Sequence, residues 1–219
     1  MNAGSGGAAA DAGARRRIVV AVTGATGAPL AARLLEVLAA LPDIETHLVM
    51  SRWARATVEL ECGHGAARLS ELADAAYAPD DQAAPISSGS FLTCGMVVVP
   101  CSMKTLAGIR TGYADGLIPR AADVVLKERR RLVLVTRETP LNEIHLENML
   151  ALSRMGAVVL PPAPAFYNRP QTVEDVVDHI VARVLDQFGI SVPAQRWEGM
   201  RSARRARESA VRPVSAVDA

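Results

Sequence analysis

The sequence has little of several residue types on which common classes of protein depend. Its 219 residues include only three cysteines, and aromatic residues make up 4% of the chain. The cysteines, Cys62, Cys94 and Cys101, are an odd number without metal-ligand spacing. This usage favours reduced thiols in an intracellular, cytoplasmic protein. The four histidines also lack the spacing of a metal site, so we expect no metal ion.

Long apolar runs and an excess of one charge are missing as well. No apolar run reaches the roughly 18 residues that a membrane span needs. The formal net charge is +1, which gives no reason to expect binding to nucleic acid. Half of the residues are hydrophobic, enough for one sizeable core. We expect one domain over residues 16–198, between a disordered low-complexity tail (1–15) and a basic tail (199–219).

Apolar strands alternate with amphipathic helices along this domain. Strand patterns lie at residues 17–23, 44–50, 96–100, 132–136 and 157–160, and the ambiguous stretch 64–82 is compatible with a short helix and a short strand around Tyr77. Helical patterns lie at residues 28–40, 52–62, 102–112, 116–130, 142–155 and 172–188. The alternation predicts an α/β fold: a doubly wound, mostly parallel Rossmann- or flavodoxin-like sheet of about six strands with helices on both faces.

The turn after the first strand reads TGATGAP, from Thr23 to Pro29. Small residues here let backbone N–H groups approach an anion at a helix N-terminus. The turn lacks the full G-x-G-x-x-G spacing, and Ser51 stands where a dinucleotide site has an acidic residue. An NAD site is therefore poorly supported, whereas FMN remains open. A plain tight turn between strand and helix is the alternative.

Two further segments offer hydroxyl groups. In PCSMKT, Pro100–Thr105, the first turn of a helix could receive a flavin's phosphate or ring carbonyls, and Ser102 could equally be only an N-cap. The neighbouring Cys101 is a weak candidate for a nucleophile, because no histidine is near it in the sequence. The segment SSGSF, Ser87–Phe91, suits either a loop over a phosphate or a simple linker.

A cationic block runs from residue 120 to residue 140. Arg120 and Lys127 are seven residues apart, nearly two helical turns, so they share one helix face. A buried strand follows and ends at Arg137 and Glu138. Because ligands of open α/β sheets bind outside the carboxyl ends of the strands, the block predicts a phosphate site with a carboxylate at its edge. The intervening arginines, 129–131, are expected to be solvated.

A second phosphate site is suggested near the C-terminal end of the domain. Tyr167 lies in the loop after the last strand, and Arg183 lies in the long helix that follows. A phenol and a guanidinium together can hold a phosphate. A tyrosine that merely closes the loop is the alternative.

Taken together, these motifs resemble the flavin prenyltransferase (UbiX-like) family over about residues 17–197. The matching segments are TGATGA, HLVMS, ISSGS, PCSMKTLAGI, RAADVVLKERR, RETP, IHLENML, GAVVLPPAPAFY and RVLDQFGI. The resemblance implies an enzyme that binds reduced FMN and dimethylallyl phosphate and joins the prenyl group to flavin N5 and C6. It also implies that the prenylated FMN serves a UbiD-type decarboxylase, and that the protein is a homododecamer built from trimers with active sites at subunit interfaces.

The resemblance implies roles for individual residues. FMN contacts are expected from Gly24, Ala25, Thr26, Ser51, Ser102, Met103, Lys104, Thr105 and Arg137. Dimethylallyl phosphate is expected at Lys127, Tyr167 and Arg183, with Arg120 close by. The expected catalytic residues are Glu138, Lys127, Glu61 and Ser102, and aromatic faces could come from Phe91, Tyr167 and Trp197. If Lys and Arg carry the charge of the phosphate, no metal is required.

Two other functions remain as alternatives. One is an FMN-dependent cysteine decarboxylase, whose P-x-M-N-x-x-M-W motif is replaced here by PCSMKTLAG and whose active-site histidine has only His47 as an unconvincing counterpart. The other is a non-catalytic FMN-binding subunit of an aromatic acid decarboxylase. Retention of the charged positions argues against the second alternative.

Overall fold

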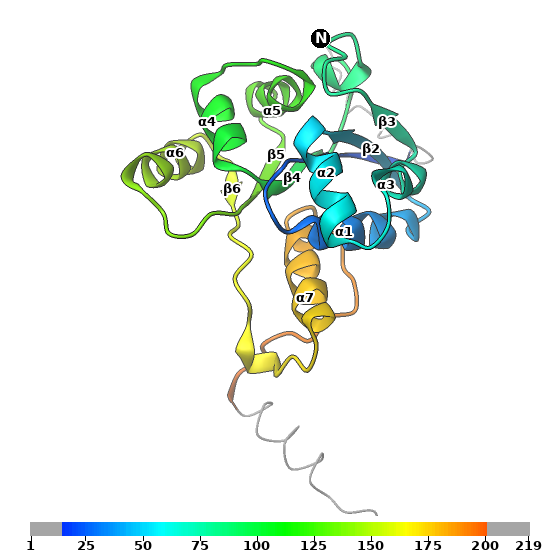
Figure 1. Ribbon diagram of the computed structural model, residues 1–219, viewed down its shortest axis with the longest axis vertical. Coiled ribbons are helices and arrows are strands. Elements are labelled where there is room, and N and C mark those ends of the chain that lie inside the picture. Colours follow the sequence, from blue (N-terminus) through cyan, green and yellow to red (C-terminus); the bar gives the residue numbers. More distant parts are fainter. Residues whose placement is uncertain (1–14, 201–219) are drawn as a thin grey trace, which may run out of the picture.

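The computed structural model describes residues 15–200, which form one six-stranded parallel sheet (Figure 1). The strand order is β3-β2-β1-β4-β5-β6. The strands are β1 (Arg16–Val22), β2 (Ile44–Met50), β3 (Ala75–Tyr77), β4 (Gly95–Cys101), β5 (Arg131–Thr136) and β6 (Val158–Val159). The predicted α/β sheet of about six strands is confirmed. Most of the two predicted tails, residues 1–14 and 201–219, lies outside the described residues.

Helices cover both faces of the sheet. One face carries α1 (Ala28–Ala39), α2 (Arg52–Glu61), α3 (Ala66–Leu72) and α7 (Val173–Asp186). The other face carries α4 (Met103–Thr111), α5 (Leu117–Lys127) and α6 (Glu143–Arg154). Two short 3₁₀ helices, η1 (Pro85–Ser87) and η2 (Phe166–Asn168), lie in the connections. None of the helices between residues 15 and 200 is long and apolar enough to cross a membrane.

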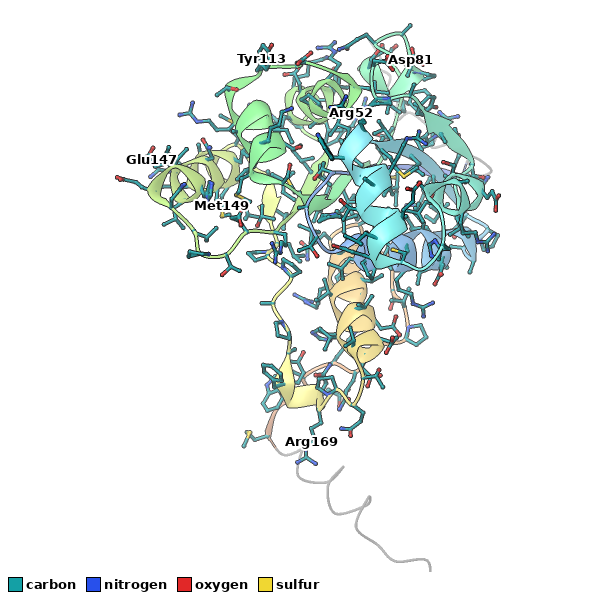
Figure 2. All side chains as sticks on the ribbon, in the orientation of Figure 1. Arg52, Asp81, Tyr113, Glu147, Met149 and Arg169 are labelled. Carbon is teal, nitrogen blue, oxygen red and sulfur yellow. The ribbon has the colours of Figure 1, made fainter. Side chains whose placement is uncertain are left out.

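The C-terminal arm, residues 161–197, packs against the sheet through the end of α7, whereas its part around η2 extends away from the sheet (Figures 1 and 2). It consists of η2, α7 and the segment that follows. The fully buried residues of α7 all lie between Ile180 and Leu185, and in its first half Val176 and Val177 are only partly buried against the same core cluster. Arg169, labelled in Figure 2, lies near the tip of the arm.

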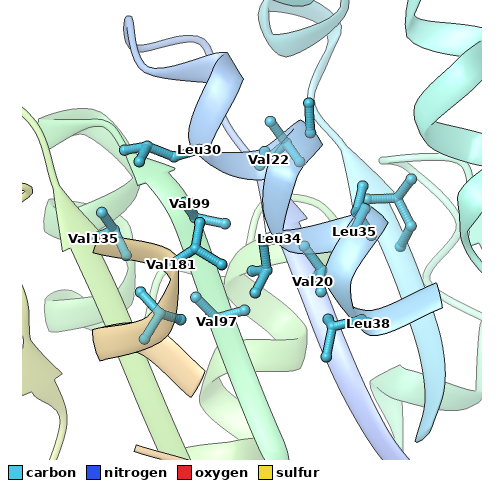
Figure 3. Packing of buried hydrophobic residues seen from close by; sticks show 14 of the residues in the cluster. Val20, Val22, Leu30, Leu34, Leu35, Leu38, Val97, Val99, Val135 and Val181 are labelled. Atoms are coloured by element: carbon cyan, nitrogen blue, oxygen red, sulfur yellow. The ribbon is translucent and has the colours of Figure 1, made fainter. Parts of the chain in front are cut away.

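Two apolar clusters explain the continuous hydrophobic runs of the strands. Alternate residues of β1 enter opposite clusters: Val20 and Val22 belong to the first, and Val19 and Ala21 to the second. Successive side chains of a strand point to opposite faces, so a strand covered on both sides is apolar throughout. Figure 3 shows part of the first cluster, where Leu34 of α1 lies over the strands.

Most element bounds differ from the sequence prediction by one to three residues, and two of these differences have a visible cause. The last strand is only Val158–Val159 instead of residues 157–160, because only these two residues have ladder partners in β5; the Leu160 N–H still donates to the Leu134 carbonyl at 2.8 Å. The helix predicted over residues 116–130 ends at Lys127. Arg129 adopts a φ of 56°, a left-handed conformation that does not continue a helix.

The strand order creates a topological switch point between β1 and β4. From β1 the chain first continues to β2 and β3 on one side, and then returns to β4, β5 and β6 on the other. In open α/β sheets, ligands bind outside the carboxyl ends of the strands at such a point.

Candidate active site

A buried hydroxyl ties the two sides of the switch point together. Thr23, just after β1, donates from Oγ1 to the Pro100 carbonyl at 2.7 Å and accepts from the Ser102 N–H at 2.9 Å. The residue is 2% exposed, so these hydrogen bonds are shielded from water. The link fixes the β1–α1 turn next to the start of α4. The sequence motif included Thr23 without indicating this role.

The predicted FMN-binding residues all lie at one edge of the sheet. They follow the carboxyl ends of four strands: Gly24, Ala25 and Thr26 after β1, Ser51 after β2, Ser102–Thr105 after β4, and Arg137 after β5. Backbone hydrogen bonds position two of them: the Ser51 N–H donates to the Val22 carbonyl at 3.0 Å, and the Arg137 N–H donates to the Cys101 carbonyl at 3.1 Å. We call this edge the flavin edge.

Serine caps begin two of the helices at the flavin edge. The Ser51 hydroxyl accepts from the Ala54 N–H at 3.1 Å, and the Ser102 hydroxyl accepts from the Thr105 N–H at 3.3 Å. The predicted N-cap role of Ser102 is therefore confirmed. An N-cap leaves the first N–H groups of its helix without an internal partner. These donors fit a polar ligand such as the phosphate or ring carbonyls of FMN.

The N-terminus of α1 is closed by Glu61 at the end of α2. Its Oε2 accepts from the N–H groups of Gly27 and Ala28 at 2.8 and 2.9 Å. A carboxylate is stabilised at this positive end of the helix dipole. Two of the N–H groups that the TGATGAP turn was expected to offer to an anion are thus paired with a carboxylate of the protein itself. Glu61, predicted as catalytic from the resemblance, therefore contacts the β1–α1 turn, whose residues are predicted to bind FMN.

Cys101 is a poor nucleophile in this environment. The side chain is completely buried, and desolvation raises the pKa of its thiol to about 12. The thiol is therefore protonated at neutral pH, and the thiolate is the reactive form. Residues 15–200 contain no group of three His, Cys, Asp or Glu side chains that could hold a metal ion.

Lys127 and Arg120, both on α5, lie against the loop formed by residues 87–91. Arg120 donates from Nε to the Ser87 carbonyl at 3.1 Å and pairs with Asp123 at 2.9 Å. Lys127 pairs with Glu128 at 2.5 Å. The loop passes so close that a Cβ on Gly89 would lie 2.7 Å from Lys127 Nζ. The segment predicted to cover a phosphate is thus held next to Lys127.

Arg130 corrects one prediction, because it is not simply solvated. Its NH1 donates to the Phe91 carbonyl at 2.8 Å, and its NH2 donates to the Gly89 carbonyl at 2.6 Å. The planar guanidinium reaches two carbonyls at once, which a lysine could not do with the same geometry. The sequence carries no signal that separates Arg130 from Arg129, since the loop it holds is distant along the chain.

Tyr167 and Arg183 line one hollow in the C-terminal arm. The hollow has a volume of about 410 Å³ and is also lined by His179 and Trp197. The Tyr167 ring lies edge-on to the Trp197 ring, with 5.5 Å between their centroids. Arg183 pairs with Asp186 at 2.7 Å. A hydrogen bond from Arg196, together with the charges of Arg196 and Arg183, lowers the pKa of the Asp186 carboxyl below its usual value, although partial burial opposes the shift.

One chain does not bring all the predicted phosphate ligands together. Lys127 precedes β5 and Arg137 follows it, and the six residues of this strand span about 20 Å. Lys127 therefore lies near the edge of the sheet where the strands begin, and Arg137 lies at the flavin edge, where the strands end. Arg183 is on α7, which packs on the face opposite to α5. The phosphate site predicted from the 120–140 block is not formed within a single chain, because β5 separates its two ends.

Comparison with known proteins relates the chain to flavin-binding enzymes. The model of the Flavoprotein family matches residues 9–185. A probable UbiX-like flavin prenyltransferase of Streptomyces sp. (strain D7) is 69% identical over 194 residues, which cover 88% of this chain and 97% of the relative.

Solved structures agree with this relationship. A dodecameric FMN-dependent UbiX-like decarboxylase from Escherichia coli O157:H7 is 65% identical, with a TM-score of 0.83 over 84% of this chain and 100% of that one. AnUbiX (PadA1), in complex with FMN and dimethylallyl pyrophosphate, is 56% identical, with a TM-score of 0.83 over 85% and 99%. The cysteine decarboxylase TvaF, at 15% identity and a TM-score of 0.57 over 80% and 99%, shares only the fold. The chain therefore belongs to the UbiX-like flavin prenyltransferase family, and the family and enzyme class predicted from its motifs are confirmed.

Proposed function

We propose that this protein joins the dimethylallyl group of dimethylallyl phosphate to N5 and C6 of reduced FMN, and that the prenylated flavin serves a UbiD-type decarboxylase. The observation that carries the proposal is the flavin edge, where residues after four strands meet beside Arg137 and Glu138. The likeness to AnUbiX, whose structure holds FMN and dimethylallyl pyrophosphate, supports the same ligands here.

The side chains of the proposed site suit the departure of a phosphate. Reduced FMN, when bound, supplies the nucleophilic N5 and C6. In this proposal, Lys127 and Arg183 offset the negative charge that grows on the phosphate as its bond to the prenyl carbon weakens. Tyr167 and Trp197 provide aromatic faces that stabilise the allylic cation. Glu138, which is exposed next to Arg137, positions the departing phosphate so that the phosphate accepts the C6 proton.

The proposed site requires more than one copy of the chain. Lys127 and Arg137 lie at opposite edges of the sheet, so a single phosphate between FMN and Lys127 needs residues from neighbouring subunits. Helix α6 offers a surface for association, because Ile144 and Leu150 are more than half exposed on it. We propose a homododecamer like the E. coli O157:H7 relative. Closed symmetric assemblies of this kind repeat the same interface in every copy.

The direct test is the mass of the flavin. We expect that incubation of the full-length protein with reduced FMN and dimethylallyl phosphate, without oxygen, adds one prenyl unit to the flavin, as measured by mass spectrometry. Omission of the protein is the control. An unchanged flavin mass would exclude the proposed transfer and would leave the non-catalytic FMN-binding subunit as the better reading.

Glu138→Gln should slow the reaction while FMN still binds. The amide keeps the shape of the side chain but removes its negative charge, and loss of such a group typically costs about 10²-fold or more in rate. Turnover is measured from prenylated flavin formed, and FMN affinity from flavin fluorescence. Glu143→Gln, which changes another exposed carboxylate at the start of α6, is the matched control and should leave both unchanged. A parallel loss of turnover and FMN affinity in Glu138→Gln would contradict the assigned role.

The cysteine decarboxylase alternative is not favoured by the position of His47. This histidine is buried in β2, where Nδ1 contacts the Tyr77 hydroxyl at 2.8 Å and Nε2 contacts Glu45 at 2.9 Å. Burial lowers the pKa of the imidazole below its usual value. A histidine with both ring nitrogens engaged inside the sheet is poorly placed to reach a substrate at the flavin edge.

A further inference from the structure

Arg130 holds the backbone of the 87–91 loop. The two terminal nitrogens of its guanidinium donate to the carbonyls of Gly89 and Phe91 at 2.6 and 2.8 Å. Arg120 holds the first carbonyl of the same loop at 3.1 Å. Since both donors of Arg130 belong to one rigid planar group, they fix the spacing and the direction of two carbonyls together. The proposed function gives Arg130 no role, although this residue helps to determine the course of the loop.

The Phe91 side chain packs against two side chains of the sheet. The Arg17 guanidinium lies over its ring, 4.7 Å from the centroid, and the His47 ring meets it edge-on with 5.0 Å between the centroids. Glu45 holds both of these side chains, at 3.2 Å from Arg17 Nε and 2.9 Å from His47 Nε2. A ring that already carries a cation on one face is better suited to anchor the loop than to stabilise an allylic cation.

The loop passes directly beside the ammonium group of Lys127. A Cβ on Gly89 would lie 2.7 Å from Lys127 Nζ and would also meet the Glu128 carboxylate. Lys127 pairs with that carboxylate at 2.5 Å. The space between the loop and these two side chains is therefore too small for a methyl group. Any shift of the loop would change which groups lie next to the ammonium.

The loop has mainly hydrogen-bond donors left for a ligand. Ser88 and Ser90 are exposed, and their hydroxyl oxygens lie 2.9 Å apart. Among residues 15–200, no acceptor pairs with the Gly89 N–H. Hydroxyl and backbone N–H groups bind phosphate oxygens, and the nearby ammonium supplies a positive charge. Because the arginines occupy the loop carbonyls, these acceptors are turned away from an anion.

We propose that Arg130 and Phe91 are positioning residues for the prenyl donor: they fix the 87–91 loop against Lys127, so that the loop and the ammonium bind one phosphate. The inference rests on the proposed function in that dimethylallyl phosphate is the ligand. Neither residue touches the ligand, and each acts through the loop. The half of the site that they order is the half that Lys127 belongs to, away from the flavin edge of the same copy.

Arg130→Lys should weaken the prenyl donor and leave FMN unchanged. Lysine keeps the charge but cannot hold two carbonyls with the geometry of a guanidinium. Calorimetric titration uses the full-length protein loaded with oxidised FMN, whose N5 is not nucleophilic, so that binding is measured without turnover. We expect dimethylallyl phosphate to bind about tenfold more weakly, the size of one charge-assisted hydrogen bond. Arg129→Lys is the matched control and should change neither ligand, since the loop carbonyls are held by Arg120 and Arg130.

Two Phe91 variants test the second anchor. Phe91→Tyr keeps the ring on which Arg17 lies and should bind dimethylallyl phosphate like the wild type. Phe91→Ala removes the ring and should weaken this ligand by about tenfold without a change for FMN. Thermal unfolding and light scattering show whether each variant keeps its fold and its oligomeric mass. Loss of that mass in both Arg130→Lys and Phe91→Ala would assign the loop to a contact between subunits and overturn its role at the phosphate.

A double variant tests whether Arg130 acts through the place of Lys127. In a Lys127→Ala protein, the alignment of the loop with the ammonium no longer matters, so Arg130→Lys should weaken the donor by less than about threefold. A further loss of about tenfold would show that the two residues act independently and would overturn the inference.

The outcomes separate this inference from the proposed function. If the wild-type protein binds dimethylallyl phosphate but Arg130→Lys weakens FMN equally, or weakens neither ligand, the positioning role is wrong and the prenyl transfer is unaffected. An equal effect of Arg129→Lys would mean a general effect of the basic segment and would also overturn it. A wild-type protein that binds no dimethylallyl phosphate would contradict the proposed function itself.

Discussion

Oligomers assembled from a mixture of Lys127→Ala and Arg137→Ala subunits should regain activity that each variant lacks by itself. Because β5 holds the two residues at opposite edges of the sheet, a site that uses both must take them from different copies. Each variant alone loses a cation from every site, which should lower turnover by about 10²-fold or more. In an equal mixture, about one quarter of the sites receive both native residues, since each is supplied independently with a chance of one half.

The measurement is prenylated flavin formed per subunit after co-expression of two differently tagged chains and purification through both tags. The matched control is a mixture of Arg137→Ala with Ser102→Ala, two changes at the same flavin edge. This mixture should regain no activity, because every copy then lacks one of the two residues that it supplies to the flavin edge. Recovery in the control, or none in the Lys127 and Arg137 mixture, would contradict a site shared between copies. In the separate variants, Lys127→Ala should weaken dimethylallyl phosphate more than FMN.

Gly24→Ala should abolish most FMN binding. The added Cβ would lie 2.4 Å from Trp53 Cβ and 3.1 Å from its carbonyl carbon, so the start of α2 or the β1–α1 turn must move. Backbone atoms cannot rotate away as the end of a side chain can. A misplacement of about 1 Å in a binding site can lower activity by about 10²-fold. Overpacking of this kind also lowers the free energy of unfolding by about 1–3 kcal/mol. FMN and riboflavin should weaken together, because the turn that holds the whole ligand is displaced.

The matched control for this variant is Gly65→Ala at the start of α3. Gly65 has a φ of −70°, and a Cβ there would meet nothing within 4 Å. FMN affinity and the unfolding temperature should therefore stay at the wild-type values. A Gly24→Ala protein that binds FMN as tightly as the wild type would show that α2 and the turn can separate without consequence for the site.

The strands and the helix starts were the most predictable features of this chain. β2 has the predicted bounds, Ile44–Met50, because a strand buried on both faces is recognisable as a continuous apolar run. Ser51 and Ser102 are N-caps of helices, a position that serine side chains favour, and the N-cap hydrogen bond joins residues only three apart in the sequence. Both signals are local, so no knowledge of the tertiary structure was needed to interpret them.

Side-chain partners that are distant along the chain could not be predicted in this way. Glu61 caps α1 from 33 and 34 residues away, and Arg130 holds the carbonyls of Gly89 and Phe91 from about 40 residues away. Glutamate and arginine side chains can pair with many groups, and the sequence around Arg130 does not distinguish it from its neighbour Arg129. The partners are determined only by the packing of α2 on the β1–α1 turn and of α5 under the 87–91 loop.

The sequence by itself determined the doubly wound sheet, the family and the set of residues that gather at the flavin edge. These follow from strand periodicity, helix caps and motifs, all of which act over short distances along the chain. The tertiary structure decided where the phosphate cations stand relative to one another. Arg120 and Lys127 share a helix face by periodicity, yet Lys127 and Arg137 lie at opposite ends of β5, whose six residues span about 20 Å. Residues close in sequence are thereby held apart by a rigid strand, which is why we propose that a complete site takes residues from a second copy of the chain.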